Sequence, residues 1–325
     1  MVIKIHGGKF LIAGGASLVG SHLVKGLLAK NAAEVVVYDP VLFDANDSLG
    51  DLKNDPRVRL VSGDVMKLHQ FIKHMDGVDG AINLAAYMSL GFSQNPWDAI
   101  DVNIKGHMNF LESARINKVG KVIFASSSAV YGFGIGGPIT EDMPHKVSDN
   151  PPSAVAYGSS KIIGEQLCRM YKQNYNLDYL ALRFSTVYGE NQHHRAANAL
   201  YIIDTYERLM RGEPAQLFGD GSESKDFVYV GDVARAILMG LESDATDDAM
   251  NISGGRSIPT KELVAMIAKI VGSDLEPEYL QEDGRVRLKS GAGLYYVNTK
   301  AFDVLGWKPE MSIEDGIRRL IKTLS

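Results

Sequence analysis

Short apolar runs alternate with longer amphipathic stretches over the first half of the chain. The runs are almost continuously hydrophobic, which is typical of parallel strands covered on both faces of a sheet. This pattern predicts a doubly wound α/β sheet with right-handed β-α-β crossovers. The predicted strands are Phe10–Ala13, Val35–Tyr38, Val58–Val61, Gly80–Leu84, Lys121–Ala125 and Tyr179–Arg183. The predicted helices between them are Val19–Lys30, Lys67–His74, Pro96–Asn117 and Ala154–Asn176.

The alternation loosens after about residue 184, where glycine, proline and polar clusters become frequent. Helices predicted at Thr260–Val271 and Ile313–Thr323 stand apart from strands. We therefore expect a smaller C-terminal α/β domain over the carboxyl edge of the sheet, and a length of 325 residues suits two domains. The expected larger domain is 1–183 with 222–246 returning to it, and the smaller one is 184–221 plus 247–325.

Composition and charge exclude several classes of protein. Apolar residues make up 45% and charged residues 22%, which is ordinary for a globular protein and unlike a disordered one. The net charge is −5 and no Lys/Arg run occurs, so we expect no nucleic-acid partner. No apolar stretch approaches the ~20 residues of a membrane span, so no membrane partner is expected either. The single cysteine, Cys168, fits a reducing compartment, and we expect a cytoplasmic protein.

The first predicted strand runs into a glycine-rich turn, Gly14-Gly15-Ala16-Ser17-Leu18-Val19-Gly20. Glycines at such a turn let a pyrophosphate approach the helix N-terminus, although an ordinary turn is the alternative. Asp39 closes the second strand, where a carboxylate accepts hydrogen bonds from ribose hydroxyls and repels a 2′-phosphate. A turn residue before Pro40 is the alternative for Asp39. Together the two features favour NAD over NADP.

A second group of polar residues carries candidate chemistry. Ser126-Ser127-Ser128 follows a predicted strand, and Tyr157 and Lys161 lie four residues apart, on one face of a predicted helix. A nearby ammonium favours phenolate, so we predict a lowered pKa for Tyr157. Such a tyrosine can take a proton from an alcohol while a hydride leaves for a nicotinamide. A surface Tyr–Lys pair is the alternative, and the preceding nucleotide turn favours catalysis.

Further motifs extend along the chain. They are Gly63-Asp64-Val65, Asn83-Leu84-Ala85-Ala86, Val102-Asn103-Ile104-Lys105-Gly106, Ser126–Gly132, Tyr157–Lys161, Leu182–Gly189, Gly219-Asp220-Gly221, Asp226–Val233 and Leu305–Pro309. With these motifs the chain resembles the extended short-chain dehydrogenase/reductase superfamily, in its NAD-dependent epimerase/dehydratase branch, nearly from end to end.

The resemblance implies a Rossmann domain that binds NAD, a C-terminal substrate-binding domain, and a homodimer formed through the helices at Pro96–Asn117 and Ala154–Asn176. It implies Tyr157 as general base, Lys161 as its ammonium partner and Ser127 as the group that orients the reacting oxygen. The cofactor-binding residues that it implies are Gly14, Ala16, Ser17, Leu18, Val19, Gly20, Asp39, Asp64, Val65, Leu84, Ala85, Ala86, Asn103, Tyr157 and Lys161.

Some positions depart from the family's pattern and bear on the substrate. Lys225 stands where an arginine usually grips a nucleotide phosphate, so the charge is kept and the bidentate fork is lost. Thr186 replaces an asparagine, Asn298 replaces an aspartate, and Glu190–Arg195 stands in place of a basic residue. Arg285 and Arg287 are candidate phosphate partners, or else solvated loop residues. The expected substrate-binding residues are Ser127, Ser128, Thr186, Arg195, Lys225, Arg287 and Tyr295.

Two absences favour one reaction class. Related 4,6-dehydratases place an Asp-Glu pair directly after the catalytic hydroxyl residue, and related decarboxylases carry a glutamate two residues before the tyrosine of Val-Tyr-Gly. Ser128 and Ala129 hold those positions here and cannot act as acid or base. The sequence therefore favours an NAD-dependent epimerase of a nucleotide sugar, acting at C4 of a UDP-hexose or UDP-hexuronate through a transient 4-keto intermediate.

Two alternatives remain open. One is an NAD-dependent dehydrogenase or reductase of a sugar or other alcohol, and the other is a catalytically silent NAD-sensing regulator. No metal is expected, because adjacent histidines such as His193-His194 seldom converge on one ion.

Overall fold

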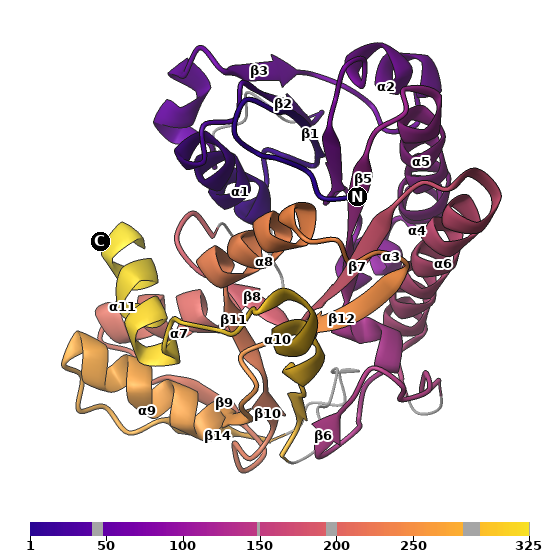
Figure 1. Ribbon diagram of the computed structural model, residues 1–325. Helices are drawn as coiled ribbons and strands as arrows, with labels where there is room; N and C mark the ends of the chain where they lie inside the picture. The colour runs from indigo at the N-terminus through magenta and orange to yellow at the C-terminus, as the bar shows by residue number, and fades with distance from the viewer. Residues whose placement is uncertain (41–47, 148–149, 193–199, 282–292, 325) are drawn as a thin grey trace.

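A parallel sheet forms the centre of the computed structural model, which describes residues 1–40, 48–147, 150–192, 200–281 and 293–324 (Figure 1). Within these residues the sheet has seven strands in the order β12-β7-β5-β4-β1-β2-β3. The strands are β1 Lys9–Ala13, β2 Glu34–Tyr38, β3 Val58–Val61, β4 Gly80–Asn83, β5 Lys121–Ser127, β7 Tyr179–Phe184 and β12 Asp248–Ile252. The strand order reverses between β1 and β4, so a crevice for a ligand is expected outside the carboxyl ends of these two strands.

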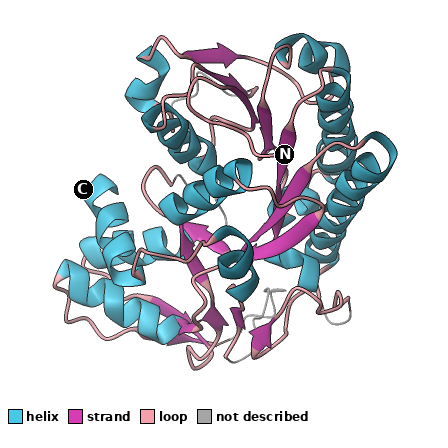
Figure 2. Ribbon diagram, in the orientation of Figure 1, coloured by secondary structure: helices cyan, strands magenta, loops and turns pink. Residues whose placement is uncertain are grey.

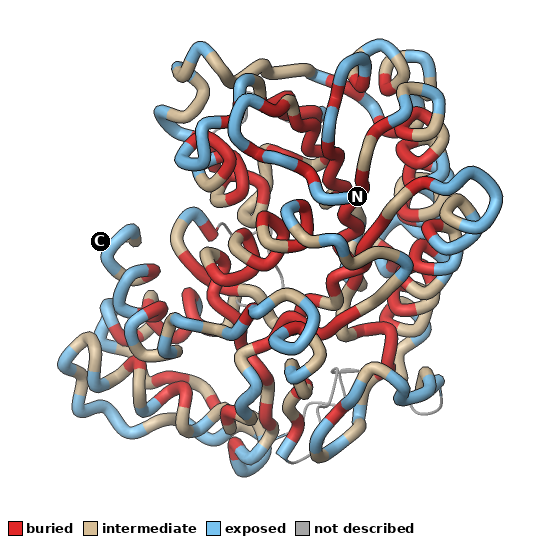
Figure 3. The backbone as a smooth tube through the Cα atoms, viewed as in Figure 1, coloured by how far each residue is buried: buried red, intermediate tan, exposed pale blue. Residues whose placement is uncertain are grey.

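Helices cover both faces of the sheet (Figures 1 and 2). On one face α1 (Leu18–Ala29) and α8 (Val230–Glu242) bury leucine and valine side chains against the strands. On the other face α2 (Leu68–His74), α5 (His107–Ile116) and α6 (Pro152–Tyr175) bury Phe71, Phe110, Leu111 and Cys168 against the strands. Most residues of the strands other than the edge strand β3 are buried, as Figure 3 shows, which explains their continuous apolar sequence. The predicted doubly wound α/β fold is confirmed.

The helix predicted over Pro96–Asn117 is interrupted. It consists of α4 (Pro96–Ile100), a π-helical turn at Asp101–Gly106, and α5. A Cβ atom on Gly106 would lie 2.6 Å from Cγ2 of Val65, so the turn packs closely against the segment after β3. Such π-helical turns within α-helices often occur at functional sites. A short helix, α3 (Ser89–Gln94), precedes α4 and was not predicted.

The C-terminal part is built from short pieces. Helices α7 (Leu200–Met210), α9 (Thr260–Val271) and α11 (Ile313–Leu324) share a separate apolar cluster, and α10 (Thr299–Leu305) lies near β12. Its strands pair two by two. The pairs are β8 (Thr186–Tyr188) with β11 (Phe227–Tyr229), β9 (Gln216–Phe218) with β14 (Glu278–Leu280), β10 (Ser224–Lys225) with β13 (Ile258–Pro259), and β6 (Pro138–Ile139) with β15 (Tyr295–Tyr296).

One segment lies in a different part of the fold from the one expected. The stretch expected to return to the larger domain was 222–246, but β12 also pairs in parallel with β7, so the returning stretch extends to Ile252. The alternation of the sequence Asp-Ala-Met-Asn-Ile is weak, because Asn251 is a buried polar residue whose partners come from distant segments. Among the helices of the described ranges, none has both the length and the apolar character that crossing a bilayer requires.

Candidate active site

The glycine-rich turn after β1 leaves no room for side chains. Gly14 has φ +77°, and a Cβ atom there would lie 2.7 Å from the backbone nitrogen of Ala85. A Cβ atom on Gly20 would lie 2.3 Å from the carbonyl oxygen of Gly15. Ser17 caps α1 by accepting a hydrogen bond from the backbone N–H of Gly20 at 3.2 Å. The turn therefore brings bare backbone and a helix N-terminus to the carboxyl edge of the sheet, as a bound pyrophosphate needs.

Two carboxylates stand beside this turn. Asp39 follows β2, is 8% exposed, and accepts a hydrogen bond from the backbone N–H of Ala16 at 3.1 Å. Asp64 follows β3 and accepts a hydrogen bond from the N–H of Met66, while the hydroxyl of Tyr38 donates to its carbonyl oxygen. Since β2 and β3 are paired neighbours, the two carboxylates lie after adjacent strands, where adenosine hydroxyls and base edges could be bound. These residues fit a dinucleotide.

The segment Leu84–Ala86 follows β4 and packs against Gly14. Asn103, in the π-helical turn, holds the next residues through two hydrogen bonds with the backbone of Tyr87, at 2.8 and 2.9 Å. Its amide also donates to the Ser160 hydroxyl on α6 at 3.0 Å. The side chain of Asn103 therefore joins the edge of the nucleotide site to the helix that carries Tyr157.

Ser127, Tyr157 and Lys161 converge at the end of β5. Ser127 is the last residue of β5, and its side chain is hydrogen bonded to that of Tyr157 on α6. Lys161 lies one helical turn further on and donates to the Ala125 carbonyl oxygen at 2.7 Å. Its Nζ is 5.9 Å from the centre of the Tyr157 ring. Tyr157 is 8% and Lys161 5% exposed, so both act in a largely desolvated environment.

The pKa direction predicted for Tyr157 is wrong for this arrangement. Burial raises the pKa of Tyr157, and the hydrogen bond with Ser127 lowers it by less. Burial also lowers the pKa of Lys161 to about 8, against the opposing effect of the Glu165 carboxylate. The lysine ammonium points at a carbonyl oxygen rather than at the phenol, which explains why it does not dominate the phenol's pKa.

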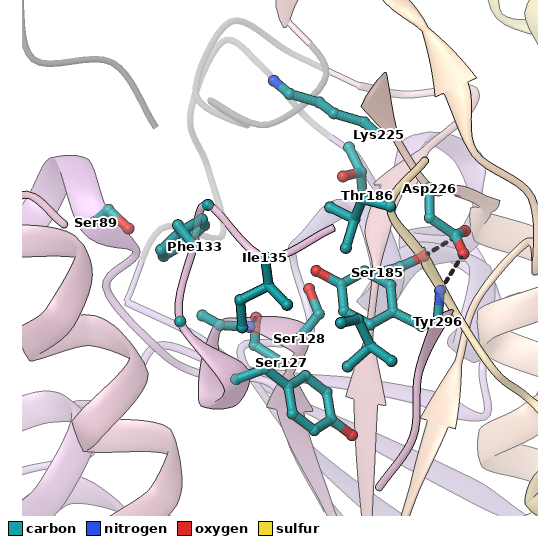
Figure 4. A pocket seen from close by; sticks show the side chains of 16 residues that line it. Ser89, Ser127, Ser128, Phe133, Ile135, Ser185, Thr186, Lys225, Asp226 and Tyr296 are labelled. Carbon is teal, nitrogen blue, oxygen red and sulfur yellow. Dashed lines mark hydrogen bonds between the residues drawn. The ribbon is translucent and has the colours of Figure 1, made fainter. Parts of the chain in front are cut away.

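A pocket opens beside these residues, over the carboxyl ends of β5 and β7 (Figure 4). Figure 4 shows Ser127 and Ser128 at one end and Lys225 at the other, with Phe133 and Ile135 on a side wall. Its lining includes Ser89, Ser127, Ser128, Phe133, Ile135, Ile139, Ser185, Thr186, Lys225, Asp226, Leu294 and Tyr296. The structure thus brings together four of the expected substrate-binding residues, namely Ser127, Ser128, Thr186 and Lys225.

Asp226 was not predicted as a site residue, yet it fixes one wall of the pocket. It is 1% exposed and accepts hydrogen bonds from the backbone N–H groups of Gly254 (2.7 Å), Gly255 (3.2 Å) and Tyr296 (2.9 Å). The hydroxyl of Ser185 donates to it at 3.3 Å. Burial raises the pKa of Asp226 to about 7, and these donors hold it from rising further.

The aromatic wall residue is Tyr296, whereas the sequence pointed to Tyr295. Tyr296 lines the pocket, its hydroxyl is hydrogen bonded to Ser128, and its ring stacks on Tyr131 at 5.8 Å between centres. Tyr295 does not line the pocket, because successive strand residues face opposite sides.

Three of the candidate substrate-binding residues, Arg195, Arg285 and Arg287, lie outside the described residues. The pair His193-His194, where no metal was expected, lies outside them as well. In the described ranges no group of three or more His, Cys, Asp or Glu side chains is arranged to hold a metal ion.

Comparisons with known proteins place this geometry in context. The model of the NAD dependent epimerase/dehydratase family matches residues 10–253. The chain is 32% identical to the UDP-glucose 4-epimerase of Mycolicibacterium smegmatis over 326 residues, covering 96% of this chain and 97% of that protein. UDP-glucose 4-epimerase from Thermotoga maritima, solved with UDP-glucose, superposes with a TM-score of 0.84 at 27% identity, covering 97% and 98% of the two chains. UDP-glucuronic acid 4-epimerase from Bacillus cereus, in complex with UDP-glucuronic acid and NAD, superposes with a TM-score of 0.82 at 25% identity, covering 97% and 98%.

Proposed function

The chain belongs to the NAD-dependent epimerase/dehydratase family, and on that premise we propose that it epimerises a nucleotide sugar at C4. One observation carries the proposal. Ser127 lines one end of a pocket whose other end presents Lys225, and the buried Tyr157 and Lys161 lie beside Ser127, outside the lining itself. The cavity therefore combines groups that can react with a sugar hydroxyl and a cation that can bind a phosphate. The relatives solved with UDP-glucose and with UDP-glucuronic acid support the same substrate class.

The cofactor of this reaction is NAD, which accepts a hydride from a sugar carbon and returns it. The backbone of Gly14–Gly20 would hold its pyrophosphate, because a Cβ atom at either glycine end of that turn would collide with backbone. Asp39 would accept hydrogen bonds from the adenosine ribose, and its charge disfavours a 2′-phosphate. Leu84–Ala86 and Lys161 would line the nicotinamide half.

Three side chains handle the proton on the sugar. Tyr157, as phenolate, removes the proton of the C4 hydroxyl, and returns it after the 4-keto intermediate has turned over in the pocket. Ser127 is hydrogen bonded to the tyrosine and orients the same sugar oxygen. Lys161 supplies an adjacent positive charge, with Nζ 5.9 Å from the ring centre, which stabilises phenolate against the opposing effect of burial. Burial of both residues keeps bulk water from the proton transfer.

The pocket favours epimerisation over elimination or decarboxylation. Those reactions need a further acid or base beside the catalytic hydroxyl, and Ser128 and Ala129 stand there. The carboxylate that lines the pocket, Asp226, is engaged by three backbone N–H groups and one hydroxyl. Asp226 therefore serves to hold the pocket wall rather than to act as an acid or base on the substrate.

We also propose that the protein acts as a homodimer in the cytoplasm. Large apolar side chains are exposed along α3, α4, α5 and α6, with Trp97 at 76%. They are Leu90, Trp97, Ile100, Met108, Ile116, Ile163, Met170 and Tyr175. A second copy of this face would cover them. Light scattering should give twice the chain mass, and Trp97→Asp should shift it towards the monomer. The free, buried Cys168 suits a reducing compartment.

The test of the reaction uses substrate deuterated at C4. Enzyme and a limiting amount of NAD are incubated with C4-deuterated UDP-glucose and, separately, UDP-glucuronate, and the products are followed by NMR. We expect the C4 epimer to form with deuterium retained on carbon and no net NADH. Label released into free NADH together with an accumulating keto sugar would instead identify a dehydrogenase. Tight NAD binding without turnover of any sugar would identify a regulator.

A further inference from the structure

A buried histidine lies outside the residues that the proposed reaction uses. His107 is the first residue of α5 and is 1% exposed. Its ring stacks on Phe124 of β5, with 4.3 Å between ring centres. Both of its ring nitrogens have hydrogen-bond partners, which an apolar residue of the same size would leave unsatisfied. An imidazole in this position therefore needs an explanation beyond filling space.

The hydrogen-bond roles of His107 are fixed by its neighbours. The carbonyl oxygen of Gly164, at 3.2 Å from Nε2, can only accept, so Nε2 carries the hydrogen, and Cys168 Sγ at 3.4 Å is a weak second acceptor. The Oδ1 atom of Asn83 accepts from the N–H of Ala85 at 3.1 Å, so the amide Nδ2 of Asn83 faces His107 Nδ1 at 2.8 Å and donates to it. His107 is thus the neutral Nε2–H tautomer. Burial, with the charge of Lys161, lowers the pKa of His107 to about 3, so this form persists over the working pH range.

This chain of bonds ends at the nucleotide turn. Asn83 is the last residue of β4, and the Ala85 nitrogen that it fixes lies 2.7 Å from where a Cβ atom on Gly14 would be. At its other end, Gly164 belongs to α6, three residues after Lys161. Asn103 joins the same two elements four residues before His107, from Tyr87 to Ser160. The spacing of four on each helix puts the two links side by side on one face.

We propose that His107 is a positioning residue for the NAD site. Through Asn83 it holds Leu84–Ala86 against the glycine turn, and through Gly164 it fixes the distance between this segment and helix α6, which carries Tyr157 and Lys161. This inference rests on the proposed binding of NAD. Its essential atom is the Nδ1 acceptor, because its bond with Asn83 Nδ2 holds the amide in the orientation in which Oδ1 accepts from the Ala85 N–H.

Three substitutions separate positioning from packing. In His107→Asn the Oδ1 atom replaces the Nδ1 acceptor, but the ring and the bond to Gly164 are lost. In His107→Gln the terminal amide replaces Nε2 and the acceptor facing Asn83 is lost. In His107→Phe the ring that stacks on Phe124 is kept and both bonds are lost. Ser113→Ala, which removes a buried hydroxyl bonded to Asn109 within the same helix, is the matched control.

Two readouts are needed besides thermal stability. Amide hydrogen exchange at 84–88, measured without NAD, reports how firmly the segment is held. Titration of the purified protein with NAD gives its Kd. In His107→Gln and His107→Phe we expect faster exchange at Ala85 and NAD binding weakened about tenfold or more, the order of effect of a buried donor left without its acceptor. His107→Asn and Ser113→Ala should keep exchange and Kd within about threefold of the parent protein, even where His107→Asn melts lower than His107→Phe.

The proposal is contradicted if the affinity of the variants for NAD follows their thermal stability. If His107→Phe, with its ring in place, binds NAD as the parent protein does while His107→Asn does not, the histidine is a packing residue only. Equal losses in His107→Asn and His107→Gln would have the same meaning, and this pair decides the matter if His107→Phe does not fold. If the parent protein binds no NAD, the proposed function fails. The exchange pattern at Ala85 still tests whether His107 holds the segment Leu84–Ala86 in place.

Discussion

The two ends of the pocket are built in different ways. The end that carries Ser127 and Tyr157 belongs to the seven-stranded sheet and to α6, a helix of 24 residues. The end that carries Lys225 and the Tyr296 wall rests on strand pairs of two or three residues each. Long elements are held mainly by their many backbone hydrogen bonds, whereas short strand pairs depend more on hydrogen bonds from side chains. The end with Ser127 and Tyr157 is therefore fixed mainly by backbone, and the substrate wall mainly by side chains such as Asp226.

The catalytic end has a second layer of support beneath it. Arg183 of β7 forms two parallel hydrogen bonds with the Glu165 carboxylate on α6, at 2.9 and 2.8 Å. Ser126, next to Ser127, donates to the same carboxylate at 2.5 Å. Another nitrogen of Arg183 donates to the Tyr131 hydroxyl. Bidentate pairs of this kind hold direction as well as distance, so β5, β7 and α6 keep a common alignment.

At the substrate end, Asp226 has an equivalent role. Its two oxygens collect hydrogen bonds from three segments far apart in sequence, which include Ser185, Gly254 and Tyr296. If that carboxylate is altered, three parts of the wall are released together. The contrast predicts that variants at the catalytic end change the chemistry in a stable protein, while variants at the substrate end change affinity and stability together.

The largest effect is expected for Tyr157→Phe. The phenyl ring keeps the packing against Phe92, but the proton acceptor is gone, so kcat should fall by at least ~10²–10⁴-fold. NAD binding and the melting temperature should change little, which steady-state kinetics and calorimetry would check. Tyr171→Phe, on the same helix but bonded to Glu112 away from the pocket, is the control and should leave kcat unchanged. Near-normal turnover by Tyr157→Phe would remove this residue from the mechanism.

The second effect is expected for Lys161→Met, with opposite signs for activity and stability. Loss of the ammonium should reduce kcat by about 10²-fold, the scale of an acid–base contribution. Because burial lowers the pKa of Lys161 to about 8 from 10.5, the charged lysine destabilises the folded protein at neutral pH. Allowing for the lost bond to Ala125, we expect Lys161→Met to be about 2 kcal/mol more stable at pH 7.

The pH dependence of that stability difference gives its check. Between about pH 8 and 10.5 the unfolded parent protein binds more protons at Lys161 than the folded one, so parent stability rises with pH in this window. The advantage of Lys161→Met should therefore be constant below pH 8 and shrink above it. Urea unfolding at a series of pH values measures this difference, and a constant gap up to pH 10 would contradict the assignment.

The same contrast explains what could be predicted from the sequence. Strand β3 and helix α9 were predicted with their observed bounds, because each has a clear local period. The convergence of Ser127, Tyr157 and Lys161 was also predictable, since a strand end and a spacing of four are local features. The regular half of the molecule can thus be inferred from neighbouring residues alone.

The parts that were missed depend on long-range contacts. The π-helical turn at Asp101–Gly106 packs closely against Val65 through Gly106, a contact between distant segments that no local pattern reveals. The raised pKa of Tyr157 follows from burial by other elements. Tyr296 rather than Tyr295 faces the pocket because of a two-residue pairing with β6, where a shift of one residue exchanges the two faces.

An intermediate effect is expected for Asp226→Asn, which tests the substrate end. The amide would place an NH2 group where a carboxylate oxygen now accepts backbone N–H groups, leaving donors opposed and unsatisfied. We expect about 2–4 kcal/mol lower stability and a KM for the nucleotide sugar raised about tenfold or more, with the Kd for NAD unchanged. Asp220→Asn is the control, because Asp220 lies in an exposed turn before β10 and caps only that turn. A weakened NAD Kd in Asp226→Asn would show that the two ends are not independent.

The smallest effect is expected at Lys225, and it tests most directly whether the substrate end of the pocket binds a phosphate. Lys225 is the cation among the described residues that line the pocket, and it stands at the end away from Ser127 (Figure 4). If the substrate carries a diphosphate, Lys225→Ala should raise its KM about five- to tenfold, the scale of a partly solvated charged hydrogen bond, and leave kcat and NAD binding unchanged. Lys225→Arg should equal or improve on the parent KM, because a guanidinium can bind two phosphate oxygens at once.

Steady-state kinetics of the three proteins with a UDP-hexose, at low and high salt, measure these KM values. The rise in KM caused by Lys225→Ala should be smaller at high salt, because screening weakens the ion pair. Equal KM values in all three would mean that Lys225 binds no phosphate, and the pocket's affinity would then rest on its other lining residues, such as Ser128, Thr186 and Tyr296.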